Sequence, residues 1–158
     1  VKEMGDASRA LQTVAAGSKA LVEGPFGDFF PRDRAGAREL WIAGGVGVTP
    51  FLARVRALKA GDPVDAHLVY CVQDETRAHF LAELRAAAAR CPGLRLWPHH
   101  FAREGPLDAA FLSARCPDFA ERETFVCGPP ELVAAARAGL RRLGAPASRF
   151  HAEDFNWL

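Results

Sequence analysis

One short run, WIAGGVGVTP at residues 41–50, constrains the fold more than any other part of the chain. Three apolar residues lead into a glycine-rich turn, in which a single valine separates Gly45 from Gly47. Glycine loses conformational entropy and offers no side chain for packing, so its use here indicates that the bare backbone is needed. Thr49 is a suitable N-cap and Pro50 suits the first helical position. The run therefore predicts a strand, a glycine turn and a helix.

Apolar runs and helical patterns alternate through the rest of the chain. The pattern predicts strands at 38–45, 65–73, 94–97, 123–128 and 148–155, with helices at 49–59, 76–90, 106–114 and 130–143. This order is typical of an α/β fold in which helices cover both faces of a doubly wound, parallel, five-stranded sheet. Residues 1–32 depart from it, with a strand tail at 1–4, a helix at 5–14 and a strand at 19–29. We therefore expect a separate domain to start at residue 33 and to extend to residue 158.

The charge balance argues against a nucleic-acid partner. Lysine and arginine number 20 against 19 acidic residues, which gives a formal net charge of +1. A nucleic-acid-binding surface would show a basic surplus instead.

The four cysteines form no CxxC pair, so we expect no metal and reduced thiols in a cytoplasmic protein. His99 and His100 are adjacent in a predicted strand and would face opposite sides, which argues against a metal pair.

The glycine turn is expected to bind phosphate. Parallel sheets bind ligands beyond the carboxyl ends of their strands, and a helix N-terminus there offers free N–H groups. Gly45 and Gly47 would keep Cβ atoms out of the path of a pyrophosphate. The alternative is a turn that needs glycine for its own geometry. Pro50 stands where the GxGxxG pattern has its third glycine, so the motif alone does not decide between them.

Four segments in order resemble the ferredoxin–NADP reductase superfamily: EGPFGDF at 23–29, AGGVGVTPF at 43–51, FVCGPPEL at 125–132 and HAEDF at 151–155. They look most like the flavin dehydrogenase module of ferric reductases and NADPH oxidases. The resemblance implies that residues 1–32 are the C-terminal end of an FAD-binding β-barrel and residues 33–158 an NAD(P)-binding domain. It implies NAD(P)H and FAD as cofactors. The implied activity is hydride transfer between them, then single-electron transfer to haem, ferric iron or oxygen.

The resemblance also assigns roles to single residues. The implied contacts with the FAD pyrophosphate are Gly5 and Ser8. The implied dinucleotide loop comprises Gly45, Gly47, Thr49 and Pro50. The implied turn beside the nicotinamide comprises Cys127, Gly128 and Pro129, and the implied carboxylate and flavin-covering ring are Glu153 and Phe155. We expect Cys127, Glu153 and Phe155 to align the reacting groups, with no nucleophile among them.

The choice between NADH and NADPH depends on CVQDETR at residues 71–77. Related NADPH oxidases have arginine at the position of Gln73. Asp74 and Glu75 would repel a 2′-phosphate, whereas Arg77 would attract it. The sequence slightly favours NADH.

The expected partner is an FAD barrel upstream in the same chain, carrying the flavin ring-binding motif before Val1. A haem-bearing membrane domain further upstream would place the protein at the cytoplasmic face of a membrane. One alternative is a soluble reductase component that feeds an oxygenase or a ferredoxin. Another is a nucleotide-sensing domain without redox activity, which would have no use for Cys127 and Glu153.

Overall fold

Five parallel strands form the centre of the domain. The computed structural model describes residues 5–24, 27, 29–30 and 36–154. The strands are β1 (Arg38–Gly44), β2 (Asp65–Val72), β3 (Leu94–His100), β4 (Glu123–Gly128) and β5 (Phe150–Asp154). Their order in the sheet is β3-β2-β1-β4-β5, and every neighbouring pair is parallel. The predicted fold class is confirmed.

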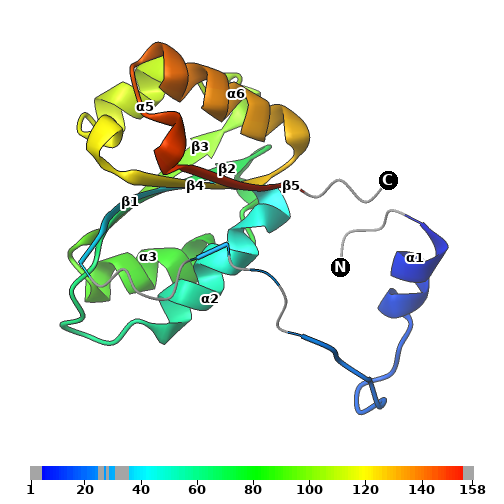
Figure 1. Ribbon diagram of the computed structural model, residues 1–158. Coiled ribbons are helices and arrows are strands. Elements are labelled where there is room, and N and C mark those ends of the chain that lie inside the picture. The colour runs from blue at the N-terminus through cyan, green and yellow to red at the C-terminus, as the bar shows by residue number, and fades with distance from the viewer. Residues whose placement is uncertain (1–4, 25–26, 28, 31–35, 155–158) are drawn as a thin grey trace.

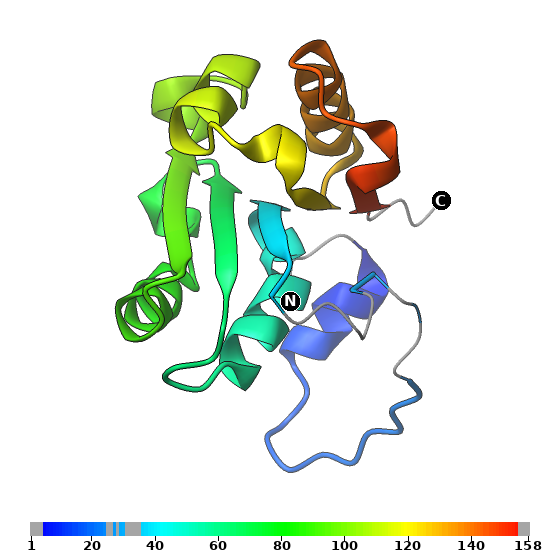
Figure 2. The same cartoon turned by 60° about the vertical axis from the view of Figure 1, so that its left-hand side comes forward.

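Helices cover both faces of this sheet. They are α2 (Thr49–Ala57), α3 (Leu81–Arg90), α4 (Phe101–Glu104), α5 (Ala109–Arg115) and α6 (Pro130–Arg142). Figures 1 and 2 show α2 and α3 on one side of the sheet and α5 and α6 on the other. Successive strand residues alternate between these faces, so Trp41 packs in the cluster beneath α2 while Ile42 packs in the cluster beneath α6. Burial on both faces explains why the strands read as continuous apolar runs.

Two aromatic residues before β1 complete the packing on the α2 side. Phe30 lies with its ring centroid 4.8 Å from that of Phe125 on β4 and 5.6 Å from that of Phe51 on α2. Phe29 makes edge contacts with the same two rings. Helices α2 and α3 connect β1, β2 and β3, whereas β4 lies on the other side of β1. The Phe29 and Phe30 rings cover β4 on this face of the sheet. Phe29 and Phe30 thus form an aromatic clasp between the N-terminal segment and the core.

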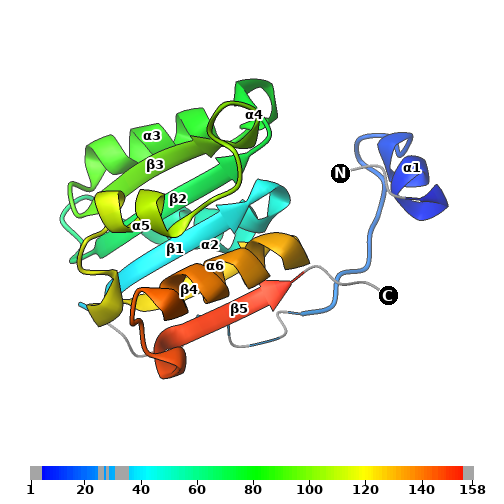
Figure 3. The same ribbon diagram turned by 90° about the horizontal axis from the view of Figure 1, so that it is seen from above.

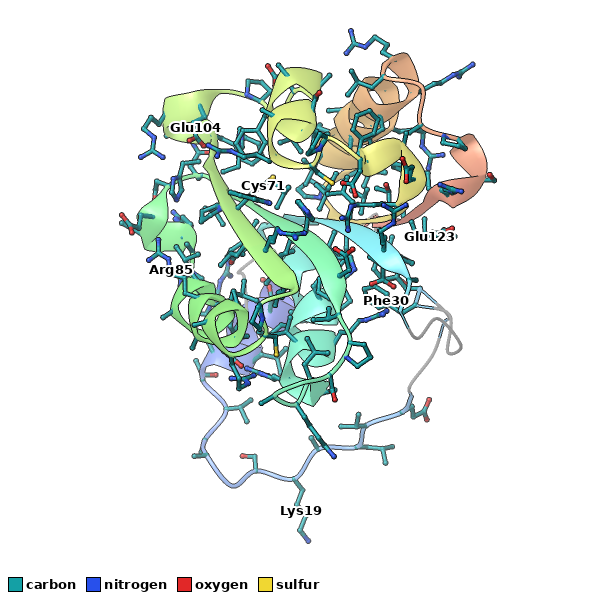
Figure 4. All side chains as sticks on the ribbon, turned by 90° about the vertical axis from the view of Figure 1, so that its left-hand side faces the viewer. Lys19, Phe30, Cys71, Arg85, Glu104 and Glu123 are labelled. Atoms are coloured by element: carbon teal, nitrogen blue, oxygen red, sulfur yellow. The ribbon has the colours of Figure 1, made fainter. Side chains whose placement is uncertain are left out.

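The described residues before the clasp carry one short helix, α1 (Asp6–Gln12), and no strand. The expected strand at 19–29 is therefore not formed at residues 19–24, where the side chains of Leu21 and Val22 are 93% and 85% exposed. A strand requires a neighbour with which to exchange backbone hydrogen bonds, and none accompanies this segment in the described structure. Figure 4 shows Lys19 extending from it into solvent. The expected strand tail at 1–4 lies outside the described residues.

Other elements also differ from their predicted limits, and α3 and β3 are two examples. The helix expected at 76–90 begins only at Leu81, because the Asp74 side chain accepts a hydrogen bond from the Thr76 amide and starts a separate 3₁₀ turn at Glu75–Arg77. The strand expected at 94–97 continues through Pro98 to His100. Proline is tolerated there because β3 is an edge strand.

All five strands end at the same edge, which Figure 3 shows as a row of arrowheads. The chain proceeds outward from β1 to β2 and β3, then returns to the other side of β1 for β4 and β5. The strand order therefore reverses between β1 and β4, the position where open α/β sheets bind their ligands. Each helix in the described part of the chain is too short or too polar to cross a bilayer.

Candidate dinucleotide site

The loops that follow β1 and β4 interlock at the reversal point through three glycines. A Cβ atom on Gly47 would overlap the carbonyl oxygen of Cys127 and lie 2.8 Å from the amide nitrogen of Gly128. A Cβ atom on Gly44 would lie 2.6 Å from Leu132 of α6. Gly128 approaches Gly44 so closely that its own Cβ would lie 3.0 Å from the Gly44 Cα. The two glycine motifs are therefore needed for packing against each other.

Gly45 differs from these three. It is exposed, its φ angle is +54°, and a Cβ atom there would meet nothing within 4 Å. The positive φ favours glycine, and the space above the residue is open. Gly45 therefore leaves its backbone open to solvent, while Gly47 contacts the second loop. The prediction that both glycines face a phosphate stays a prediction, and the structure adds a packing role for Gly47.

Helix α2 begins at this turn, with its N-cap one residue earlier than predicted. A 3₁₀ turn at Gly45–Val48 leads into α2, so Val48 is the N-cap and Thr49 is the first helical residue. The Thr49 hydroxyl donates to the carbonyl of Val46 at 3.0 Å and caps no amide. Pro50 lies in the first turn as predicted, where a missing N–H costs nothing. The first amides of α2 face the carboxyl edge of the sheet.

Cys127 and Glu153 lie side by side at this edge, as a shared role would require. They are directly paired residues of β4 and β5, and Cys127 is also paired with Ala43 of β1. The Cys127 side chain is fully buried, and burial with the nearby charge of Glu153 raises its pKa to about 12. A thiol with this pKa stays protonated and is a poor nucleophile. Phe155 lies outside the described residues.

Pro129 and Pro130 start α6 directly after Gly128. Pro129 occupies the N-cap position and Pro130 begins the helix. Their rings restrict the backbone at the turn that packs against Gly44. The CGPP sequence therefore gives a rigid loop beside the end of β1.

The segment at residues 71–77, predicted to lie by the ribose 2′ position and to decide between NADH and NADPH, extends from the end of β2 and is called the ribose loop below. Gln73 and Arg77 are both exposed, and the Gln73 carbonyl accepts a hydrogen bond from the Ala102 amide of α4. Asp74 accepts from the Thr76 amide at 2.9 Å, and hydrogen bonding by the Thr76 side chain lowers the pKa of Asp74. An ionised carboxylate is thus fixed in this loop. The α4 contact was not predicted, because it joins residues that are distant in sequence.

The predicted FAD contacts lie apart from these loops. Ser8 and Gly5 contact each other at the start of α1, where the Gly5 amide donates to the Ser8 hydroxyl at 3.0 Å. Figures 1 and 3 show α1 on the side of the carboxyl edge. Gly27 of the N-terminal part lies near Glu153, since a Cβ atom placed on Gly27 would lie 3.7 Å from the Glu153 carboxylate. The role of Gly5 and Ser8 stays a prediction.

The comparison with known proteins agrees with this geometry. The family model of the oxidoreductase NAD-binding domain matches residues 41–138, which contain both interlocking loops. The chain belongs to the oxidoreductase NAD-binding domain family.

Relatives of this NAD-binding domain are longer reductases and oxidoreductases. The ferredoxin reductase component of a 3-ketosteroid-9-alpha-monooxygenase from Mycolicibacterium smegmatis is 36% identical over 145 residues, which cover 90% of this chain and 40% of that protein. An NADPH oxidoreductase from Mycobacterium tuberculosis is 30% identical over 159 residues, which cover 98% of this chain and 42% of that protein. The NAD-binding chain thus spans less than half the length of these relatives.

Solved structures share the fold. A cytochrome P450 reductase from Amycolatopsis matches with a TM-score of 0.69 and 26% identity, over 84% of this chain and 42% of that one. A flavohemoglobin from Malassezia yamatoensis, determined with bound FAD and haem, matches with a TM-score of 0.79 over 99% of this chain and 42% of that one. At 20% identity the second match shows the fold alone. The predicted membership of the ferredoxin–NADP reductase superfamily is confirmed.

A second polar cluster lies at the opposite, amino edge of the sheet of this NAD-binding domain. His67, Cys116 and Asp118 bring potential ligand atoms within 4.8 Å of one another, beside a pocket of about 400 Å³. Each of them already has a partner. Arg122, 3% exposed, donates twice to Asp118, at 2.8 Å each time, while Cys116 donates to the same carboxylate and Trp97 donates to Nδ1 of His67. The cluster is a hydrogen-bonded network that joins the ends of several strands.

Sequence reasoning also missed a buried ion pair near the clasp. Glu39 of β1 is 2% exposed and accepts hydrogen bonds from Nε1 of Trp41 at 2.7 Å and from Arg54 of α2 at 2.9 Å. The Arg54 guanidinium lies 4.7 Å from the centroid of the Phe30 ring. A charged residue within an otherwise apolar strand was the signal that could have revealed this pair, since a buried carboxylate needs a partner.

Proposed function

We propose that this domain binds NADH at the carboxyl edge of its sheet and directs a hydride to an FAD held by a preceding part of the same protein. The observation that carries the proposal is the arrangement at the reversal point. There an open left-handed glycine, the N-terminus of α2 and the paired residues Cys127 and Glu153 lie at adjacent strand ends. These features fit a dinucleotide, since the space above the Gly45 backbone is open and lies beside the start of α2.

Different residues would contact different parts of the nucleotide. The Gly45 backbone and the first amides of α2 would hold the pyrophosphate, because free N–H groups and the helix dipole attract anions. Cys127, Gly128 and Pro129 would shape the wall beside the nicotinamide, and Glu153 would lie at its rim. The nicotinamide and the flavin supply the hydride chemistry, so the protein contributes alignment and exclusion of water. Buried, protonated Cys127 suits an aligning role.

The fixed carboxylate of Asp74 favours NADH. Two donor groups of Thr76 hold this side chain in place after β2, and they stabilise its ionised form. A second anion near the ribose would repel the 2′-phosphate of NADPH. Arg77 is exposed nearby and is the residue that would oppose this preference.

The acceptor proposed for the whole protein is an oxygenase component. Among the relatives, names such as ferredoxin reductase component of a 3-ketosteroid-9-alpha-monooxygenase and glycine betaine monooxygenase reductase subunit describe this role for those proteins. This support favours the reductase of an oxygenase over a membrane haem reductase. A nucleotide sensor without redox activity remains distinguishable, since it would bind NADH without reducing flavin.

A matched pair of glycine variants tests the binding loop in the intact protein. Gly45 and Gly61 both have positive φ angles, +54° and +89°, and neither has any atom within 4 Å of its would-be Cβ. Gly61 lies in the loop before β2, at the amino edge. Alanine at either position should cost about 1 kcal/mol of stability through backbone strain. Only Gly45→Ala should weaken NADH binding, by about tenfold if it costs about 1.4 kcal/mol of phosphate contact.

The measurements are NADH titration by calorimetry and flavin reduction by stopped-flow absorbance. Equal NADH affinity in the two variants would show that the glycine loop does not carry the nucleotide. Tight NADH binding with no flavin reduction in the wild-type protein would favour the sensor instead.

A further inference from the structure

His99 occupies an enclosed position at the carboxyl end of β3. Its side chain is 2% exposed, and its ring makes edge contacts with Phe101 of α4 and Phe111 of α5, with centroid distances of 5.4 and 4.8 Å. Two packed rings on two helices hold the imidazole in one orientation. The expectation that His99 and His100 would not form a metal pair leaves this buried histidine without a role.

His99 contacts the turn that contains α4 through one ring nitrogen. Nε2 donates to the carbonyl of Gly105 at 2.9 Å. Nδ1 lies 3.4 Å from the Glu104 carboxylate and makes no hydrogen bond among the described residues. The same carboxylate accepts from the backbone amide of His100 at 2.7 Å, and this hydrogen bond lowers the pKa of Glu104. His99 therefore holds the C-terminal end of this short turn at Gly105, whose φ angle is +73°, while the Glu104 carboxylate holds its start at the His100 amide.

This turn holds the loop after β2. The amide of Ala102, in the first turn of α4, donates to the carbonyl of Gln73 at 2.9 Å. Gln73 opens the loop that also contains Asp74 and Arg77. Figure 3 shows α4 at the carboxyl ends of β2 and β3, and Figure 4 labels Glu104 there. A continuous set of contacts thus leads from His99 through α4 to the predicted ribose loop.

We propose that His99 is a positioning residue for the adenosine end of the bound nucleotide, acting through the α4 turn and the Gln73 carbonyl. The inference rests on the proposed function, because it requires the Gln73–Arg77 loop to contact the adenosine ribose. His99 touches neither the nucleotide phosphates nor the nicotinamide in this scheme. Its loss should therefore weaken binding of the adenosine half and leave the hydride step unchanged.

Flavin reduction in the intact protein tests this with two substrates, NADH and reduced nicotinamide mononucleotide, which lacks the adenosine half. His99→Leu should raise KM for NADH by about tenfold with kcat unchanged, as expected for loss of uniform binding. KM for the mononucleotide should not change. His99→Gln retains a donor for the Gly105 carbonyl and should restore most of the NADH affinity.

Two further variants keep the test decisive if His99→Leu does not fold. Ala102→Pro removes the amide that binds Gln73, at an exposed position in the first turn of a helix, and Ala102→Ser keeps that amide. The proline variant alone should reproduce the rise in KM for NADH. His67→Leu is the control for loss of a buried histidine, because His67 is 5% exposed and lies at the amino edge, so it should lower stability and leave KM unchanged.

Equal KM values for NADH in the wild-type protein, His99→Leu and Ala102→Pro would overturn the inference. A rise of the same size with the mononucleotide would overturn it too, because the effect would then not act at the adenosine end. Failure of the proposed function would appear in the wild-type protein itself, as an absence of flavin reduction by NADH, and would overturn both.

Discussion

Substitution of Gly47 by alanine should damage the fold before it affects the ligand. The added Cβ would overlap the Cys127 carbonyl oxygen and lie 2.5 Å from the carbonyl carbon and 2.8 Å from the Gly128 amide nitrogen. All three atoms belong to the backbone of β4, which is paired on both sides by β1 and β5. No flexible side chain can move aside to make room, so the two loops must separate.

The expected cost is large for a single methyl group. Overpacking of a closed site usually costs about 1–3 kcal/mol, and a clash with paired backbone belongs at the upper end, about 3 kcal/mol. For a domain of this size, each kcal/mol lowers the melting temperature by about 2–4 °C, so a loss of roughly 6–12 °C is expected. Gly45→Ala adds the same methyl group two residues earlier, in open space, and should cost about 1 kcal/mol.

Urea unfolding of both variants, followed by circular dichroism and by tryptophan fluorescence, measures this difference. Trp41 is fully buried in β1 and should report the transition of the sheet. A Gly47→Ala variant as stable as Gly45→Ala would refute the packing argument. Gly47 would then be bare for the ligand alone, as the sequence suggested.

Three further outcomes are expected. Cys127→Ala should slow flavin reduction yet leave it measurable in stopped flow, and no covalent adduct on Cys127 should appear by mass spectrometry, because burial raises its pKa to about 12. Burial, with neighbouring arginine charges, lowers the pKa of His67 in the folded protein. Below about pH 6.5 the unfolded chain therefore binds a proton that the folded protein does not, and the free energy of unfolding should fall as the pH drops. His67→Gln should reduce this pH dependence in urea titrations at several pH values. Arg54→Leu removes the salt bridge to buried Glu39 and should lower the free energy of unfolding by about 3 kcal/mol, measured by thermal unfolding. Arg56→Leu, at an exposed ion pair on the same helix, is the control, and an equal loss in both variants would argue against a stabilising role of the buried pair.

The strands and the fold class could be predicted because their signals are local. A run such as LWIAG is buried on both faces and reads as apolar without a break, so the strand predicted at 38–45 ends within one residue of β1, Arg38–Gly44. The late start of α3 was less visible. It depends on a competing hydrogen bond in which the Asp74 side chain accepts from the Thr76 amide, and short polar side chains often bind the nearby backbone in this way.

The site could be predicted in part for the same reason. The two glycine motifs stand out in the sequence, but their contact joins residues about 80 positions apart, and nothing local indicates it. Gly47 shows the consequence: its neighbour is the Cys127 carbonyl, a partner that only the sheet order brings close. The α4 turn that binds Gln73 was missed because four helical residues give no periodic pattern.

The aromatic clasp affects where this domain can be joined to another. Phe29 and Phe30 precede β1 in the chain, yet their rings pack against Phe51 and Phe125 in the core. A chimeric reductase made by fusing a foreign flavin module directly to β1 would lack both rings and would expose apolar surface on β4. A junction placed before Phe29 would carry the clasp along with the domain. The position of the fusion point, rather than the length of the linker, should therefore decide whether such a hybrid remains stable.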